Sequence, residues 1–144
     1  MDLDRYTIVL LLAADEAPKL SEEEASALQE AHMAHLADLH DAGHLLAAGP
    51  VMGAADRRLR GFSILNVDPD RALQLKSEDP AVKAGVYRLE AHLWMLPSGL
   101  MHFTKGLLPR SMAEVRDPAT SQPASPTPPR VSRSQAGRPP RSAG

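Results

Sequence analysis

Two histidines and one aspartate are the residues of this 144-residue chain whose types and spacing best fit acid–base chemistry. His32 and His35 lie three positions apart, so a helix would place both on one face. Asp79 precedes a proline, which disfavours helical backbone there and places the carboxylate at a chain reversal. A histidine titrates near neutral pH, and a carboxylate beside it orients the ring, so such a pair can transfer protons. Two simpler interpretations stay open, namely buried histidines bonded to backbone and an ordinary Asp-Pro turn.

The same residues give little support for a metal or a cofactor. Histidines spaced i, i+3 could chelate a metal, but no HExxH pattern or third ligand accompanies them, so we expect no metal. The chain has no cysteine, which excludes disulfides, thiolate nucleophiles and zinc sites that depend on sulfur. Since it also shows no phosphate-binding loop and no redox-cofactor motif, we expect a cofactor-free site.

A helix is predicted to carry both histidines. The sequence Ser21-Glu22-Glu23-Glu24 is a capping box that begins it, and Gly43 ends it. At about 100° per residue the histidines fall within its apolar arc, formed by Ala25, Leu28, Leu36 and Leu39. His40 and His44 are expected on the solvent side or at the helix end.

The remaining elements predict an α+β fold. Strands are expected at residues 5–13, 44–52, 59–67 and 86–96, and a second helix at 68–77. The order β-α-β-β-α-β is the split βαβ of ferredoxin-like folds, an antiparallel sheet with both helices on one face. In the last strand Tyr87, Leu89, Ala91, Leu93 and Met95 alternate with Arg88, Glu90, His92 and Trp94.

The uncovered face of this sheet predicts a homodimer. With Phe62 and Trp94 on it, the face would expose apolar area unless a second copy covered it. Residues 98–115 are expected to add an irregular or strand-like extension against that dimer.

Composition divides the chain into a folded domain, residues 1–115, and a tail, residues 116–144. The domain holds 11 Lys and Arg against 17 Asp and Glu, whereas the tail holds 5 Arg against one Asp and 7 of the 13 prolines. The tail has a single valine and no aromatic residue, so we expect it to be disordered. An acidic domain does not attract phosphate backbones, so no nucleic-acid partner is expected. No stretch resembles a membrane span or a signal peptide, which predicts a cytoplasmic protein with no membrane contact.

Two motifs resemble those of the YciI-like (YCII-related) proteins. Residues 32–50 (HMAHLADLHDAGHLLAAGP) resemble that family's histidine-led helix running through glycine to a Leu-Leu-x-x-Gly-Pro strand. Residues 79–87 (DPAVKAGVY) resemble its D-P-x-V-x-A-G-V-Y segment, and Gly61 falls where the family has a glycine opening the third strand. The resemblance spans roughly residues 5 to 97, with the motifs in the family's order.

This resemblance implies a dimeric α+β barrel related to muconolactone isomerase, with His32 and Asp79 as an acid/base pair. The resulting hypothesis is a small-molecule lyase or isomerase in which Gly49 and Pro50 line the cleft and His35 assists in binding substrate. Many family members carry an arginine three residues before the histidine, where this chain has Gln29, so no cation for an anionic substrate is expected there. A non-catalytic dimeric module that binds a small ligand or a protein is the main alternative. A cofactor-free monooxygenase is a third, less favoured by a chain with two Phe, two Tyr and one Trp.

Overall fold

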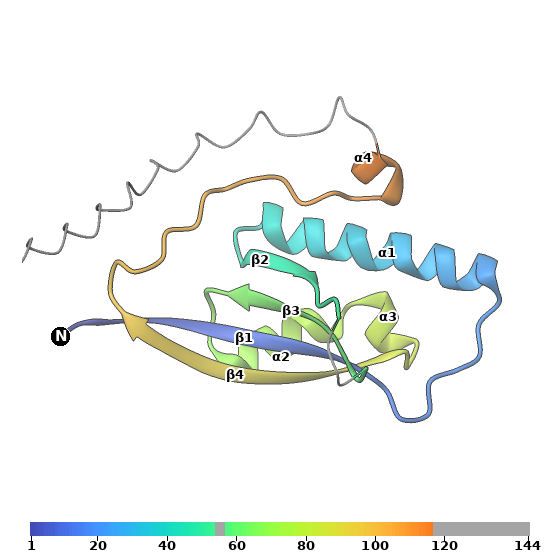
Figure 1. Ribbon diagram of the computed structural model, residues 1–144, viewed down its shortest axis with the longest axis horizontal. Coiled ribbons are helices and arrows are strands. Elements are labelled where there is room, and N and C mark those ends of the chain that lie inside the picture. Colours follow the sequence, from blue (N-terminus) through green and yellow to red (C-terminus); the bar gives the residue numbers. More distant parts are fainter. Residues whose placement is uncertain (54–56, 117–144) are drawn as a thin grey trace, which may run out of the picture.

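The computed structural model describes residues 1–53 and 57–116, which form one antiparallel sheet with helices on one side (Figure 1). The sheet order is β2-β3-β1-β4, and each neighbouring pair of strands is antiparallel. The predicted α+β, ferredoxin-like fold is therefore confirmed. The elements are β1 Leu3–Ala13, α1 Glu22–Asp41, β2 Leu45–Pro50, β3 Leu59–Leu65, α2 Pro69–Ser77, α3 Pro80–Lys83, β4 Tyr87–Pro97 and α4 Met112–Arg116. The tail expected at residues 116–144 lies, except for Arg116, outside the described residues and stays a prediction.

Helix α1 begins at the predicted capping box. The Ser21 hydroxyl accepts from the Glu24 N–H at 3.1 Å, and the Glu24 carboxylate accepts from the Ser21 N–H at 3.0 Å. Three glutamates in the first turn lie near the positive end of the helix dipole, which stabilises this end further. At the other end Gly43 takes φ +83°, a conformation that suits glycine and turns the chain into β2.

Helix α2 is followed by a short helix, α3, that the sequence interpretation did not include. Asp68 caps α2 through its bond from the Arg71 N–H, and Pro69 occupies the first turn, where a missing N–H costs nothing. Asp79 caps α3 in the same way, with Pro80 next to it. The chain reversal expected at Asp79 is therefore a helix start that fixes the direction of its carboxylate.

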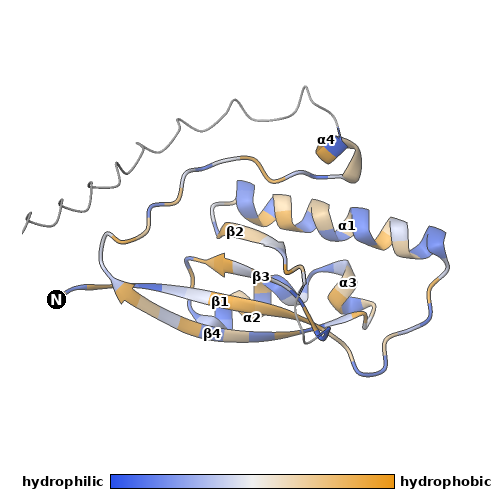
Figure 2. Ribbon diagram, viewed as in Figure 1, coloured by the Kyte–Doolittle hydropathy of each residue, from blue (hydrophilic) through white to orange (hydrophobic). Residues whose placement is uncertain are grey.

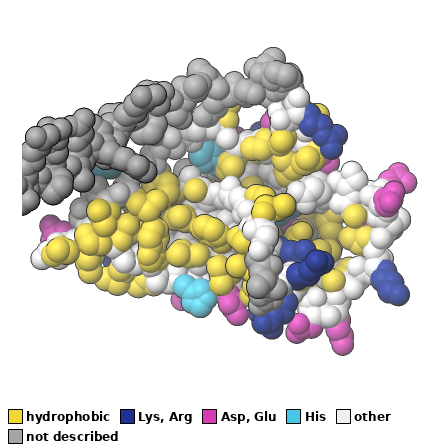
Figure 3. All heavy atoms as spheres, viewed as in Figure 1, with side chains coloured by type: hydrophobic (Ala, Val, Ile, Leu, Met, Phe, Trp, Pro, Cys, Tyr) yellow, Lys and Arg dark blue, Asp and Glu magenta, His cyan; other side chains and the backbone are white. Residues whose placement is uncertain are grey.

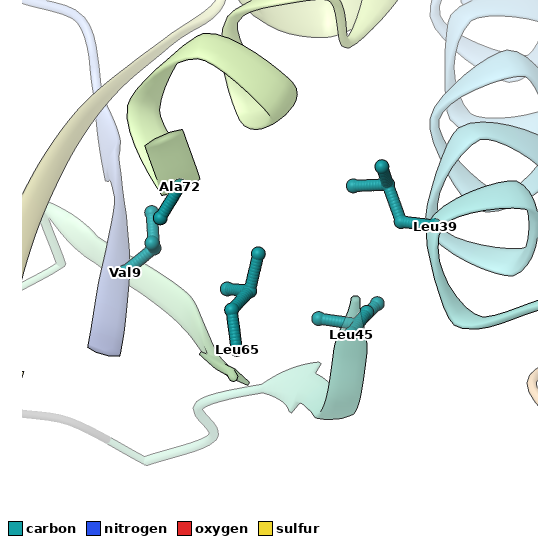
Figure 4. Packing of buried hydrophobic residues seen from close by; sticks show 5 residues of the cluster. All are labelled: Val9, Leu39, Leu45, Leu65 and Ala72. Carbon is teal, nitrogen blue, oxygen red and sulfur yellow. The ribbon is translucent and has the colours of Figure 1, made fainter. Parts of the chain in front are cut away.

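The core lies between the sheet and the helices. Its buried centre contains one side chain from each of five elements, and these converge in Figure 4: Val9, Leu39, Leu45, Leu65 and Ala72. Apolar residues run along β1, β2 and β3, whereas α1 mixes polar and apolar residues along its length (Figure 2). Burying these side chains contributes roughly 1.5–3 kcal/mol for each large one and fixes α1 and α2 on the sheet.

The opposite face of the sheet carries no helix. Cross-strand pairing places Ile8 with Ile64 and Leu10 with Phe62 on this face, and Phe62 is 45% exposed. Figure 3 shows hydrophobic side chains gathered over the strands on the face turned towards the viewer. This apolar open face agrees with the expectation for Phe62 and Trp94, although Trp94 is half-buried against Tyr6.

The alternation predicted for the last strand holds only along part of β4. Leu89 and Ala91 pack against the core, as expected, but Leu93 and Met95 are more than 40% exposed. That end of β4 extends past the helices (Figure 1), which leaves the two side chains partly exposed. On the other face Leu96 is buried instead.

The segment after β4 is irregular, with no strand among its described residues, and it ends in α4. Phe103 packs edge-on against Tyr6 at a ring distance of 5.2 Å, and the chain then reaches α1. There Arg110 pairs with Asp38 and Asp41, and the Met112 N–H donates to Glu30. The extension expected to lie against a dimer is thus attached to helix α1 of its own chain. In the described part of the chain, no helix is long and apolar enough to cross a membrane.

Candidate functional site

A hydrogen bond joins His32 of α1 to Asp79, the residue that caps α3. His32 Nδ1 lies 2.5 Å from Asp79 Oδ2, although the two residues are 47 positions apart in the chain. The side chain of His32 is 10% exposed and that of Asp79 is fully buried. Tyr87 of β4 flanks the imidazole at a ring distance of 5.9 Å. The two residues that the sequence singled out are therefore direct partners.

The local structure around Asp79 keeps its carboxylate ionised. Burial raises the pKa of Asp79, but the hydrogen bond and charge of His32, the Ala81 N–H and the charge of Lys76 lower it more, so the net pKa lies below the usual value of 3.8. An ionised carboxylate only accepts hydrogen bonds, so the proton of the short contact resides on His32 Nδ1. In the neutral ring this leaves Nε2 with a free lone pair.

The free edge of His32 borders a cavity of about 780 Å³. Nδ1 is held against a fully buried carboxylate, so the exposed part of the ring lies on the edge that carries Nε2. No described residue bonds to Nε2. The cavity lies between α1 and the sheet, with Met33 and Leu36 from the helix and Leu11 and Ser63 from the strands in its wall. Its volume is in the range of small-molecule sites.

Gly49 and Pro50, the residues expected to line a cleft, are both in this wall, and so is Gly61. A Cβ added to Gly61 would lie 2.7 Å from the Gly49 carbonyl oxygen, closer than real Cβ contacts allow. Glycine at position 61 therefore lets β2 and β3 pair closely beside the cavity.

His35 is not among the residues that line the cavity. Its Nε2–H donates to the Leu75 carbonyl at 3.2 Å, which ties α1 to α2. Burial lowers the pKa of His35 even though the Asp79 charge raises it, so this imidazole is neutral at neutral pH. The structure thus places His35 close to the His32–Asp79 pair but in a helix–helix contact.

Lys76 of α2 is a cavity residue that the sequence interpretation missed. It is 3% exposed and lines the cavity with His32. Burial is the largest influence on it and lowers its pKa from 10.5 to about 8, against the opposing effect of Asp79. A signal was present: Lys76 follows Ala72 by four residues, so it lies on the same buried face of α2.

The C-terminal segment completes the rim of the cavity. Leu108, Pro109, Met112 and Val115 all line it, so the residues around α4 lie across the space from the strands. Gln29 of α1 is in the same wall. Within residues 1–53 and 57–116 no group of three or more His, Cys, Asp or Glu side chains could hold a metal ion.

These features define the class of the protein: a ferredoxin-like α+β domain with a histidine–carboxylate pair at a small-molecule-sized cavity. The YCII-related domain family matches residues 7–91, more than half of the chain, and the protein belongs to this family. The family resemblance of the two sequence motifs is thereby confirmed.

Among solved structures, the chain is similar to 5-chloro-2-hydroxyhydroquinone dehydrochlorinase from Burkholderia phenoliruptrix AC1100, in complex with 2,5-dihydroxybenzoquinone. The two share 20% sequence identity with a TM-score of 0.46, and the match covers 62% of this chain and 92% of that chain. No curated protein matches the chain.

Proposed function

We propose that the protein is a cofactor-free lyase or isomerase that moves a proton on a small cyclic or aromatic molecule. The observation that carries the proposal is the 2.5 Å contact between His32 Nδ1 and a fully buried Asp79, beside a cavity that the other edge of the imidazole borders. A carboxylate that fixes one ring nitrogen as a donor makes the other a base of defined direction.

In this proposal His32 Nε2 takes a proton from a carbon next to a carbonyl of the bound molecule. The electron pair of the broken C–H bond then forms a double bond, and the imidazolium is stabilised by Asp79. In an isomerisation the imidazolium returns the proton to another atom of the same molecule. In an elimination the C–H electron pair forms a double bond to the neighbouring carbon, and the leaving group on that carbon departs with the electron pair of its own bond.

Hydrogen exchange provides a test that requires no knowledge of the natural substrate. The protein is incubated in D₂O with a panel of small cyclic ketones and hydroxylated aromatic compounds, and deuterium incorporation is followed by mass spectrometry. His32→Gln should abolish the exchange, and Asp79→Asn should slow it by about 10²- to 10⁴-fold, the usual contribution of a positioned acid or base. His102→Gln is the matched control, because His102 is exposed and is not among the residues that line the cavity.

Exchange that persists in His32→Gln would refute the assignment of the base. Binding of panel compounds without any exchange would favour the alternative, a module that binds a small ligand without transforming it.

We further propose that the open sheet face pairs with a second copy of the chain. The face carries Ile8, Leu10 and Phe62 side by side, and no described segment covers Phe62. Contiguous exposed apolar surface of this kind marks a protein interface. Burying the face against its own copy would give a symmetric dimer, the commonest oligomer of soluble proteins.

Sedimentation velocity tests the dimer. The wild type should sediment as a dimer, and Ile8→Lys should shift it to a monomer, since a charge in the middle of the apolar face is costly to bury. Leu20→Lys, a substitution at an exposed leucine before α1, should leave the dimer intact. A monomeric wild type would contradict the proposal.

A further inference from the structure

The charged residues in the cavity wall share one sign. Among the described lining residues, Lys76, Arg57 and Arg60 are basic, and none is an aspartate or a glutamate. Asp79 lies behind the wall, fully buried and bonded to His32 and Ala81. The cavity is therefore electropositive, although the domain as a whole carries more acidic than basic residues.

Lys76 is the basic residue that lies deepest. In the described part of the chain its ammonium group has no hydrogen-bond or ion-pair partner, whereas every fully buried side-chain nitrogen and oxygen there has one. The Lys76 Nζ must therefore emerge at the cavity surface, which agrees with its place in the wall. A cation removed from water without a partner is costly, and the lowered pKa, about 8, reflects that cost.

We propose that Lys76 binds the anionic group of the protein's ligand, a small molecule with an apolar body and one carboxylate or similarly charged oxygen group. This inference deepens the proposed function, on which it rests for the cavity and for the position of His32. An anion beside Lys76 would supply the missing partner, and their attraction is strong because the site is shielded from water. Arg57 and Arg60 are exposed and would attract the anion at the entrance.

The rest of the wall fits the apolar body. Leu11, Met33 and Leu36 face the space from the sheet and α1, and Tyr87 adds a ring next to His32. An anion held at Lys76 would fix the orientation of the molecule relative to His32. The geometry thus assigns Lys76 a binding role and His32 the chemistry.

Matched pairs of probes test the charge preference. Benzoate, phenylacetate and cyclohexanecarboxylate are titrated into the full-length protein, and their neutral amides are titrated in parallel. Binding is followed by NMR from the backbone N–H signals of Gly49 and Gly61. The carboxylates should bind at least about tenfold more tightly than their amides, which corresponds to a difference of about 1.4 kcal/mol in binding free energy. In Lys76→Met this preference should disappear. In Lys83→Met, which alters an exposed lysine paired with Glu78, the preference should remain.

A pH series gives a readout that does not depend on a substitution. Carboxylate affinity of the wild type should fall by about tenfold or more between about pH 7.5 and 9.5, because Lys76 loses its proton with a pKa of about 8. The titratable groups near Lys76 are His32 and His35 on α1 and Asp79, which caps α3, and the amide probes control for them. Lys76→Arg stays charged throughout, so its carboxylate affinity should not change with pH.

Equal binding of acids and amides by the wild type, or failure of every carboxylate to bind, would overturn the inference. So would a carboxylate preference that survives in Lys76→Met. Carboxylate binding without deuterium exchange would refute the proposed chemistry but leave the anion site standing. Exchange on carboxylates that is unaffected by Lys76→Met would refute the anion site but leave the proposed chemistry standing.

Discussion

Replacing Lys76 by methionine should stabilise the protein at neutral pH, and the gain should vanish as the pH rises. Lys76 is 3% exposed, and its ammonium group has no hydrogen-bond or ion-pair partner in the described part of the chain. Methionine keeps much of the length of the side chain without the charge, so the variant removes the desolvation penalty and preserves most of the packing.

The pKa of Lys76 gives the magnitude and the direction. The unfolded chain keeps the Lys76 proton up to a pKa of about 10.5, whereas the folded protein releases it with a pKa of about 8. Between these values the unfolded state binds more protons, so raising the pH favours the folded state. Since one pKa unit corresponds to about 1.4 kcal/mol, the full effect is about 3 kcal/mol. The penalty is fully present below pH 8 and is lost by about pH 10.5.

Urea unfolding followed by far-UV circular dichroism measures the effect. The free energy of unfolding is determined for wild type and Lys76→Met at a series of pH values from about 7 to 10.5. The difference between them should be largest at neutral pH and should shrink by about 3 kcal/mol across the series. Other groups titrate in both proteins and cancel in the difference.

Lys83→Met is the control, because the exposed Lys83–Glu78 pair should give a difference that does not depend on pH. A constant difference between wild type and Lys76→Met across the pH range would refute the reasoning, since it would mean that the buried ammonium is solvated in the folded state.

Three further predictions concern the His32–Asp79 pair, the β2–β3 pairing and the C-terminal segment. In Asp79→Asn the side chain offers one acceptor oxygen, whereas the Ala81 N–H and the His32 Nδ1–H require two. ¹⁵N NMR spectra at alkaline pH should therefore show His32 changing from the Nδ1–H to the Nε2–H tautomer. An unchanged tautomer would mean that Asp79 does not set the tautomer of His32. Gly61→Ala should destabilise the protein by about 1–3 kcal/mol in urea unfolding, since its methyl group would meet backbone. Gly49→Ala should lower the free energy of unfolding less, because its Cβ would meet nothing within 4 Å. Equal losses of stability in the two variants would contradict the packing argument. Arg110→Ala removes the pairs with Asp38 and Asp41, so amide hydrogen exchange over residues 110–116 should accelerate, whereas Arg88→Ala should leave these rates unchanged.

Most of the secondary structure follows from short-range interactions that can be read along the chain. The capping box at Ser21 predicted the start of α1, and Asp68-Pro69 predicted the start of α2, because caps and first-turn prolines act within a few residues. The alternation of β4 was reliable only where helices cover the strand. Leu93 and Met95 continue the pattern in sequence but are exposed, since the extent of the covering layer is not encoded in strand periodicity.

The sequence by itself therefore determined the elements, their order, membership in the YCII-related family and the two residues worth pairing, His32 and Asp79. Only the tertiary structure decided that these two residues meet at 2.5 Å, that His35 bonds to Leu75 instead of lining the cavity, and that Lys76 reaches the same space as His32. The physical reason is that caps and periodicity act along a few turns of one element. Burial and partner choice depend on how α1, α2 and the sheet pack together, and no single segment contains that information.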